Sequence, residues 1–127
     1  MTAWTPEGLN GQMFAVVGRH MPPPPEGFTP PVLWGTEDRV RELFEGADEV
    51  RCERRPAKNS VHAESVGAWL DYLERVLGPM VLAKAALEPQ ERWPAVRADL
   101  TALYESFNES GDDTMRAEPE YLLTIVR

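Results

Sequence analysis

Four consecutive prolines, Pro22 to Pro25, divide the sequence into segments that must form separate secondary structure elements. Proline lacks a backbone N–H donor and clashes with the preceding helical turn, so no helix passes through such a run. The run favours an extended polyproline conformation, and Pro30-Pro31 continues the irregular region to about Gly35. A run of this kind is either a rigid connector or a ligand for an aromatic-lined groove. We favour the connector.

The segment before the prolines carries a helix-start signal, Thr5-Pro6-Glu7. A threonine can cap a helix, proline suits the first helical position, and a glutamate complements the helix dipole. The apolar face of this predicted helix consists of Leu9, Met13, Phe14, Val16 and Val17, and three glycines weaken it.

Capping residues and apolar spacing predict further helices after the prolines. Thr36 and Ser65 are each placed to cap a helix. We expect helices from Thr36 to about Gly46, from Ser65 to Gly78-Pro79, over Met80–Leu87 and over Gln90–Asn108. The apolar stripe of the last helix is Trp93, Val96, Leu100, Leu103 and Phe107.

Two segments are typical of β-strands. In Asp48–Arg55, Val50 and Cys52 alternate with charged residues, and Tyr121–Val126 is short and rich in β-formers. Together with the helices, these segments predict one α+β domain over residues 1–127, with two or three strands and four or five helices.

The charge balance argues against some classes of partner. The formal net charge is -8, so nucleic acid and anionic membrane surfaces would repel the chain on average. The first 17 residues do not resemble a signal peptide, and no apolar stretch approaches the roughly 20 residues of a membrane span. The single cysteine, Cys52, excludes an intrachain disulfide. We expect a soluble, cytoplasmic protein.

Few residues suggest chemistry. The sequence contains no glycine-rich phosphate or dinucleotide loop and no nucleophile elbow. His20 and His62 lie far apart in the sequence, and a surface or capping role is favoured over a cleft. Cys52 is interpreted as a small core residue. A basic cluster is either an anion site or, as we favour, a solvated strand end; it consists of Arg51, Arg54, Arg55 and Lys58.

An ordered set of short segments suggests a family. The segments are Trp4-Thr5-Pro6-Glu7-Gly8, Gly11-Gln12-Met13-Phe14, Gly18-Arg19-His20, the tetraproline, Pro30-Pro31-Val32-Leu33-Trp34-Gly35, Leu77-Gly78-Pro79 and Glu118-Pro119-Glu120-Tyr121-Leu122. In this order they resemble the C-terminal half of class I S-adenosylmethionine-dependent methyltransferases, of the small bacterial group related to the ubiquinone and menaquinone methylases.

The resemblance implies part of a seven-stranded, Rossmann-like sheet flanked by helices. Trp4–Gly8 would be the exit from the fifth strand, Asp48–Arg55 the sixth strand and Glu118–Val126 the seventh, antiparallel strand. Two helices between the last two strands would cover one face. The family binds its cofactor through a glycine-rich turn after the first strand and an acidic residue after the second, and this chain has neither. We therefore expect no catalytic and no cofactor-binding residue here.

The resemblance also suggests a substrate-side cleft. Trp4, Thr5 and Glu7 would face this cleft in a complete enzyme, and the region from His20 to Trp34 would cover it. We further expect Tyr121–Val126 to be an unpaired edge strand, through which the chain forms a homodimer or binds a complementing N-terminal half. The leading hypothesis is a methyltransferase fragment that requires such a half. The alternatives are a non-enzymatic interaction module and a small-molecule binding domain.

Overall fold

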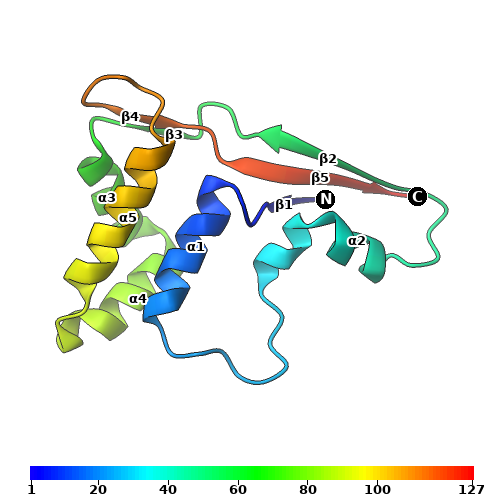
Figure 1. The fold of residues 1–127 in the computed structure, drawn as a ribbon, viewed down its shortest axis with the longest axis horizontal. Coiled ribbons are helices and arrows are strands. Elements are labelled where there is room, and N and C mark those ends of the chain that lie inside the picture. The colour runs from blue at the N-terminus through cyan, green and yellow to red at the C-terminus, as the bar shows by residue number, and fades with distance from the viewer.

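The proline run lies in an exposed connection between two elements of the computed structural model, which describes residues 1–127. Helix α1 (Leu9–His20) ends before the run, and a short 3-10 helix, η1 (Pro31–Gly35), follows it. Every residue from Pro22 to Pro31 is exposed. In Figure 1 this connection loops away from the rest of the chain.

The fold is mixed α+β, as predicted. The remaining helices are α2 (Glu37–Leu43), α3 (Val66–Val76), α4 (Gly78–Leu87), the 3-10 helix η2 (Glu88–Gln90) and α5 (Trp93–Phe107). The strands are β1 (Thr2–Trp4), β2 (Val50–Pro56), β3 (Val61–Ala63), β4 (Met115–Ala117) and β5 (Glu120–Val126). No helix combines the length and the apolar character needed to cross a membrane.

Two predicted helix caps are confirmed. The Thr36 hydroxyl accepts a hydrogen bond from the Arg39 backbone N–H at the start of α2. The Ser65 hydroxyl accepts one from the Ala68 N–H at the start of α3, at 3.0 Å. Each hydroxyl satisfies a backbone donor that the first helical turn leaves without a partner.

The predicted start of the first helix is wrong by one turn. Helix α1 begins at Leu9, and Thr5 and Pro6 belong to the tight turn that leads from β1 into it. The Thr5 hydroxyl still accepts a hydrogen bond from a backbone N–H, but the donor is Gly8, at 3.2 Å. The Thr5 N–H in turn donates to the Glu120 carbonyl, which continues the ladder of the sheet past Trp4.

The three-stranded sheet has the order β1-β5-β2, so β5 lies in its centre. Strand β5 pairs antiparallel with β1 over residues 2–4 and with β2 over residues 50–56. The expectation that Tyr121–Val126 is an unpaired edge strand is therefore wrong. The edges are β1, where η1 packs, and β2, whose charged side chains and Pro56 discourage further strand pairing.

A second, two-stranded sheet was not predicted. Strands β3 and β4 pair antiparallel through only three residues each. Segments this short show no alternation that could be distinguished from a loop, and their pairing joins residues more than fifty positions apart.

The hydrophobic core lies among the helices. Its buried residues come from α1, α3, α4, α5 and the β3–β4 ribbon, and none comes from the three-stranded sheet. Figure 1 shows these helices gathered beside the sheet. The expectation that the helices between β2 and β5 cover a face of the sheet is therefore wrong; they pack mainly on α1 and on each other.

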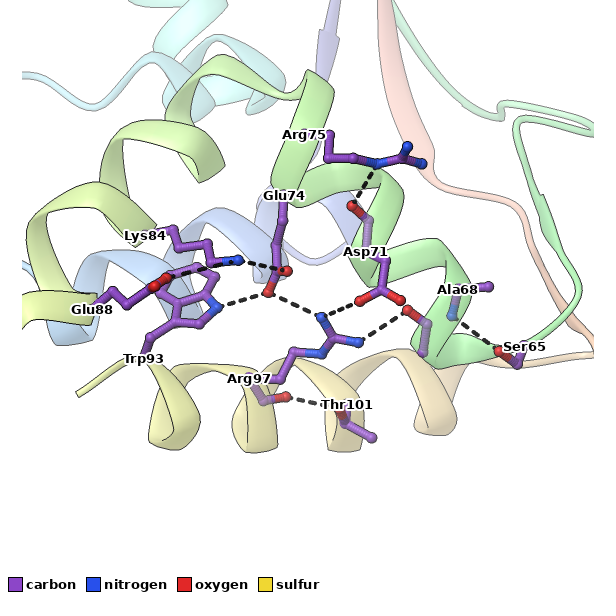
Figure 2. A network of polar contacts seen from close by, with 11 residues as sticks. Ser65, Ala68, Asp71, Glu74, Arg75, Lys84, Glu88, Trp93, Arg97 and Thr101 are labelled. Carbon is purple, nitrogen blue, oxygen red and sulfur yellow. Dashed lines mark hydrogen bonds and ion pairs between the residues drawn. The ribbon is translucent and has the colours of Figure 1, made fainter. Parts of the chain in front are cut away.

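A polar network ties three of these helices together (Figure 2). The Glu74 carboxylate on α3 contacts two residues of α5. It accepts a hydrogen bond from Trp93 Nε1 at 2.7 Å and forms an ion pair with Arg97 Nη1 at 3.0 Å. Lys84 Nζ on α4 lies 3.4 Å from the same carboxylate. Only 10% of the Glu74 side chain is exposed, so this single carboxylate fixes α4 and α5 relative to α3.

Candidate functional site

An apolar pocket of about 230 Å³ opens where β1 ends and α1 begins. Trp4 is the last residue of β1, Ser60 lies between β2 and β3, Val61 is the first residue of β3, and Pro119 precedes β5. The other lining residues are Asn10, Met13 and Phe14 of α1, Trp69 and Leu73 of α3, Leu77 between α3 and α4, and Tyr104 of α5. The pocket thus joins the sheet to the helical core.

Two aromatic pairs support the pocket walls. Trp4 meets Tyr121 of β5 edge to face, with ring centroids 6.5 Å apart. Trp69 lies against Tyr72, with centroids 5.5 Å apart. Such contacts restrict the rings, so both indoles present fixed surfaces to the pocket.

Two polar groups at the inner wall lack hydrogen bonds to the protein. The buried indole nitrogen Nε1 of Trp69 has no partner. Tyr104 is 1% exposed and lines the pocket, and its hydroxyl donates no hydrogen bond to another group of the chain. The Trp69 N–H lies close to this hydroxyl without reaching hydrogen-bond geometry.

The Tyr104 hydroxyl stays protonated near neutral pH. Burial raises the pKa of Tyr104 to about 12, and the nearby Trp69 N–H opposes this only in part. The hydroxyl is therefore a neutral hydrogen-bond donor and acceptor and does not serve as a base at neutral pH.

A larger and more open depression, of about 540 Å³, lies over α3, α4 and η2. Its lining includes Glu74, Lys84 and Glu88. These charges already pair with one another, at 3.4 Å for Lys84–Glu74 and 3.8 Å for Lys84–Glu88. Because its polar groups have partners and its shape is open, we take the apolar pocket as the candidate site.

The structure places the five residues predicted for the cleft in different surroundings. Trp4 lines the apolar pocket. Thr5 follows it but is completely buried, and its hydroxyl donates to Glu120 Oε1 at 2.8 Å. Glu7 is exposed and lies 3.5 Å from Arg54. Only Trp4 of these three contributes to the pocket wall.

The other two predicted cleft residues do not line the pocket either. His20, at the C-terminal end of α1, pairs with Asp99 of α5 through Nε2, at 2.7 Å. Trp34 lies in η1 and is 38% exposed. Next to it, Gly35 packs directly on the Trp4 carbonyl, which brings η1 near β1 without adding Trp34 to the pocket.

The remaining sequence candidates lie at the surface or in the sheet. His62 is exposed on β3, and Cys52 is partly buried with Sγ 3.9 Å from Thr124 Oγ1. In the basic cluster, Arg51, Arg54 and Arg55 each pair with a glutamate, which favours the solvated strand end. No group of three His, Cys, Asp or Glu side chains is arranged to hold a metal ion.

Thr5→Val is expected to lower the free energy of unfolding by about 1.5 kcal/mol. The substitution keeps the shape of the side chain but leaves the buried Gly8 N–H without an acceptor, a loss of about 1–3 kcal/mol. Urea unfolding followed by circular dichroism measures the change. Thr2→Val, on the exposed part of β1, is the matched control and should change stability by less than about 0.5 kcal/mol. Equal effects of the two substitutions would contradict the role of Thr5 in this turn.

Two of the pocket residues that the sequence did not indicate, Trp69 and Tyr104, are aromatic side chains that carry a polar group. Trp69 falls inside the helix predicted from Ser65 to Gly78-Pro79, and the apolar stripe predicted for the last helix contains Leu100 but not Tyr104. One signal was available: Tyr104 stands four positions after Leu100, on the buried face of α5. A tyrosine at such a position carries a hydroxyl that needs a partner, and that requirement indicates either a buried network or a cavity.

Comparisons of this chain with protein-family models, with curated proteins and with solved structures gave no match.

Proposed function

We propose that this chain is the substrate-side part of an S-adenosylmethionine-dependent methyltransferase whose cofactor-binding part is a separate segment. The observation that carries this proposal is the direction of the strands. The sequence resemblance implies a strand that ends at the Trp4–Gly8 segment and strands over 48–55 and 118–126, the last of them antiparallel. Strands β1, β2 and β5 occupy these positions, and β5 is antiparallel to both others. Strands β1 and β2 are thus parallel to each other.

The position of the pocket supports the same proposal. In open α/β sheets, ligands bind beyond the carboxyl ends of the parallel strands. Trp4 is the carboxyl-terminal residue of β1, and Ser60 follows β2. The pocket therefore lies at the edge of the sheet where such folds hold their substrates.

In this proposal, the other segment binds the cofactor. A glycine-rich turn lets backbone amides approach a cofactor closely, and the sequence has no such turn after any strand. Because β5 is central, a complementing segment would not add to it. We propose that the complementing segment pairs with the edge strand β1. Gly35 packs on β1 at Trp4, so the pairing would use the other end of the strand, at Thr2.

This proposal predicts that the chain alone does not bind S-adenosylmethionine. Isothermal titration with up to millimolar cofactor should give no saturable heat. The DNA upstream of Met1, translated in frame, should encode a strand followed by a glycine-rich turn, and coexpression of that segment with this chain should give a complex that binds the cofactor. Saturable binding by the isolated chain, or a stop codon immediately upstream beside a ribosome-binding site, would contradict the proposal.

One observation favours a second candidate, the interaction module. Pro22 to Pro25 are all exposed, and the exposed side chain of Phe28 follows them. An extended proline run of this kind fits the aromatic-lined groove of a proline-reading domain. Fluorescence anisotropy with a panel of such domains tests this candidate. Binding that survives replacement of all four prolines by alanine would exclude it.

A further inference from the structure

The two unpartnered polar groups of the pocket lie on the same wall. Trp69 Nε1 is buried without a hydrogen bond, and the neighbouring Tyr104 hydroxyl borders the cavity. More than nine in ten buried polar groups have a partner, and each one without a partner costs about 1–3 kcal/mol. The Trp69 N–H lies near enough to the Tyr104 hydroxyl to donate to it after a small shift, so the group that still needs a partner is the hydroxyl proton, and the pocket is where an acceptor can approach it.

The cavity volume limits the size of that missing partner. An apolar cavity of about 150 Å³ holds benzene. The pocket has about 230 Å³ and opens to solvent at its rim, where Ser60 is exposed. It has room for a single ring with a small substituent, rather than for a nucleoside.

The lining limits the charge of the ligand. None of the eleven lining residues is an Asp, Glu, Lys, Arg or His. A charged ligand would lose its hydration without gaining a counter-ion, at a cost of several kcal/mol. Apolar and aromatic side chains predominate, and Asn10 contributes the one side-chain amide of the lining.

We propose that this pocket binds a neutral, ring-sized molecule that carries one hydrogen-bond acceptor, held by a hydrogen bond from the Tyr104 hydroxyl. When the hydroxyl donates to the ligand, its lone pairs remain free to accept from the Trp69 N–H, so a small shift of either ring satisfies both groups in one chain of hydrogen bonds. That such a molecule is the methyl acceptor rests on the proposed function; the binding itself rests only on the pocket.

The test uses the isolated chain and three matched probes. Acetophenone has a ring and a carbonyl acceptor, ethylbenzene has a similar shape without the acceptor, and benzoate adds a negative charge. Indole N–H resonances in ¹H–¹⁵N spectra report binding, with Trp69 assigned from a Trp69→Phe variant. We expect acetophenone to shift the Trp69 resonance saturably, ethylbenzene to bind about five-fold more weakly, and benzoate to give no saturable shift.

Substitution of the anchor separates recognition from general apolar binding. Tyr104→Phe keeps the buried ring and removes only the hydroxyl, so acetophenone should bind about five-fold more weakly and ethylbenzene should be unaffected. Tyr72→Phe, an exposed tyrosine outside the lining, is the control and should change neither affinity.

Two results would overturn the inference. One is the absence of a saturable shift with either neutral ring. The other is equal binding of acetophenone and ethylbenzene with no effect of Tyr104→Phe. Neither result depends on S-adenosylmethionine or on the upstream segment, so a failure here is distinguishable from a failure of the proposed function.

Discussion

Gly11→Ala is expected to lower the free energy of unfolding by about 3 kcal/mol, or roughly 10 °C in Tm. A Cβ at this position would lie 2.1 Å from the Thr5 carbonyl oxygen and 2.7 Å from Pro6 Cα. Both are backbone atoms of the turn that leads into α1, so they cannot rotate away as a flexible side chain would. The methyl group therefore forces α1 away from the turn or deforms the turn itself.

Gly18→Ala in the same helix is the matched control. No atom lies within 4 Å of a Cβ at this position, and Gly18 is exposed. Alanine is the better helix former by about 0.8–1 kcal/mol, so this substitution should raise stability. Thermal and urea unfolding of the two variants, followed by circular dichroism, compare them directly. If both variants changed stability in the same direction, the close packing of α1 on the Thr5–Pro6 turn would be contradicted.

Glu74→Ala is expected to lower the free energy of unfolding by about 2 kcal/mol. The substitution removes the acceptor of Trp93 Nε1 and the counter-ion of Arg97 and Lys84 at a position where the carboxylate is nearly buried. Arg97 keeps Asp71, at 2.9 Å, so its charge is not left without a partner. Glu88→Ala, which removes an exposed carboxylate 3.8 Å from Lys84, should cost less than about 0.5 kcal/mol.

The contribution of Glu74 should also depend on pH. Burial alone would raise the pKa of Glu74, but the hydrogen bonds from Trp93 and Arg97 and the charges of Arg97 and Lys84 hold it below the ordinary value of 4.5. The unfolded chain therefore binds the proton first as the pH falls, and the stabilisation is present above about pH 4.5 and lost below it.

Urea unfolding of the wild-type chain and of a Glu74→Gln variant, compared at pH 7 and at successively lower pH, tests this dependence. Glutamine keeps the shape of the side chain and can accept from Trp93, but it carries no charge. The difference in stability between the two should be largest at pH 7 and should shrink as the pH falls below 4.5. A difference that stayed constant across this range would show that the carboxylate charge does not stabilise the network.

Local sequence signals predicted most of the helices because their causes are local. Thr36 and Ser65 cap helices through hydrogen bonds to donors three residues away. Pro94 marks the first turn of α5, which begins at Trp93 rather than at Gln90. The start of α1 was predicted too early because Thr5-Pro6-Glu7 carries the same residues as a cap, while the hydrogen bond from the Thr5 N–H to the Glu120 carbonyl holds these residues in the turn after β1.

The order of the strands could not be predicted from the residues. Alternation in Asp48–Arg55 and the β-formers of Tyr121–Val126 predicted strands, but the pattern of a strand does not name its neighbours. The central position of β5 depends on β1, whose three residues were too few to classify, and on pairing across more than a hundred positions. The candidate site was missed for the same reason, since Trp4, Trp69 and Tyr104 meet only in the folded chain.

The central position of β5 has a consequence for the time course of folding. Residues 120–126 leave the ribosome after every other strand, yet both β1 and β2 need them as their pairing partner. The helices pack mainly on one another, so much of their core can assemble earlier, while the three-stranded sheet must wait for the last segment. Until β5 arrives, β1 and β2 expose unpaired backbone groups on the growing chain, and this interval is when the protein is most open to association with other chains.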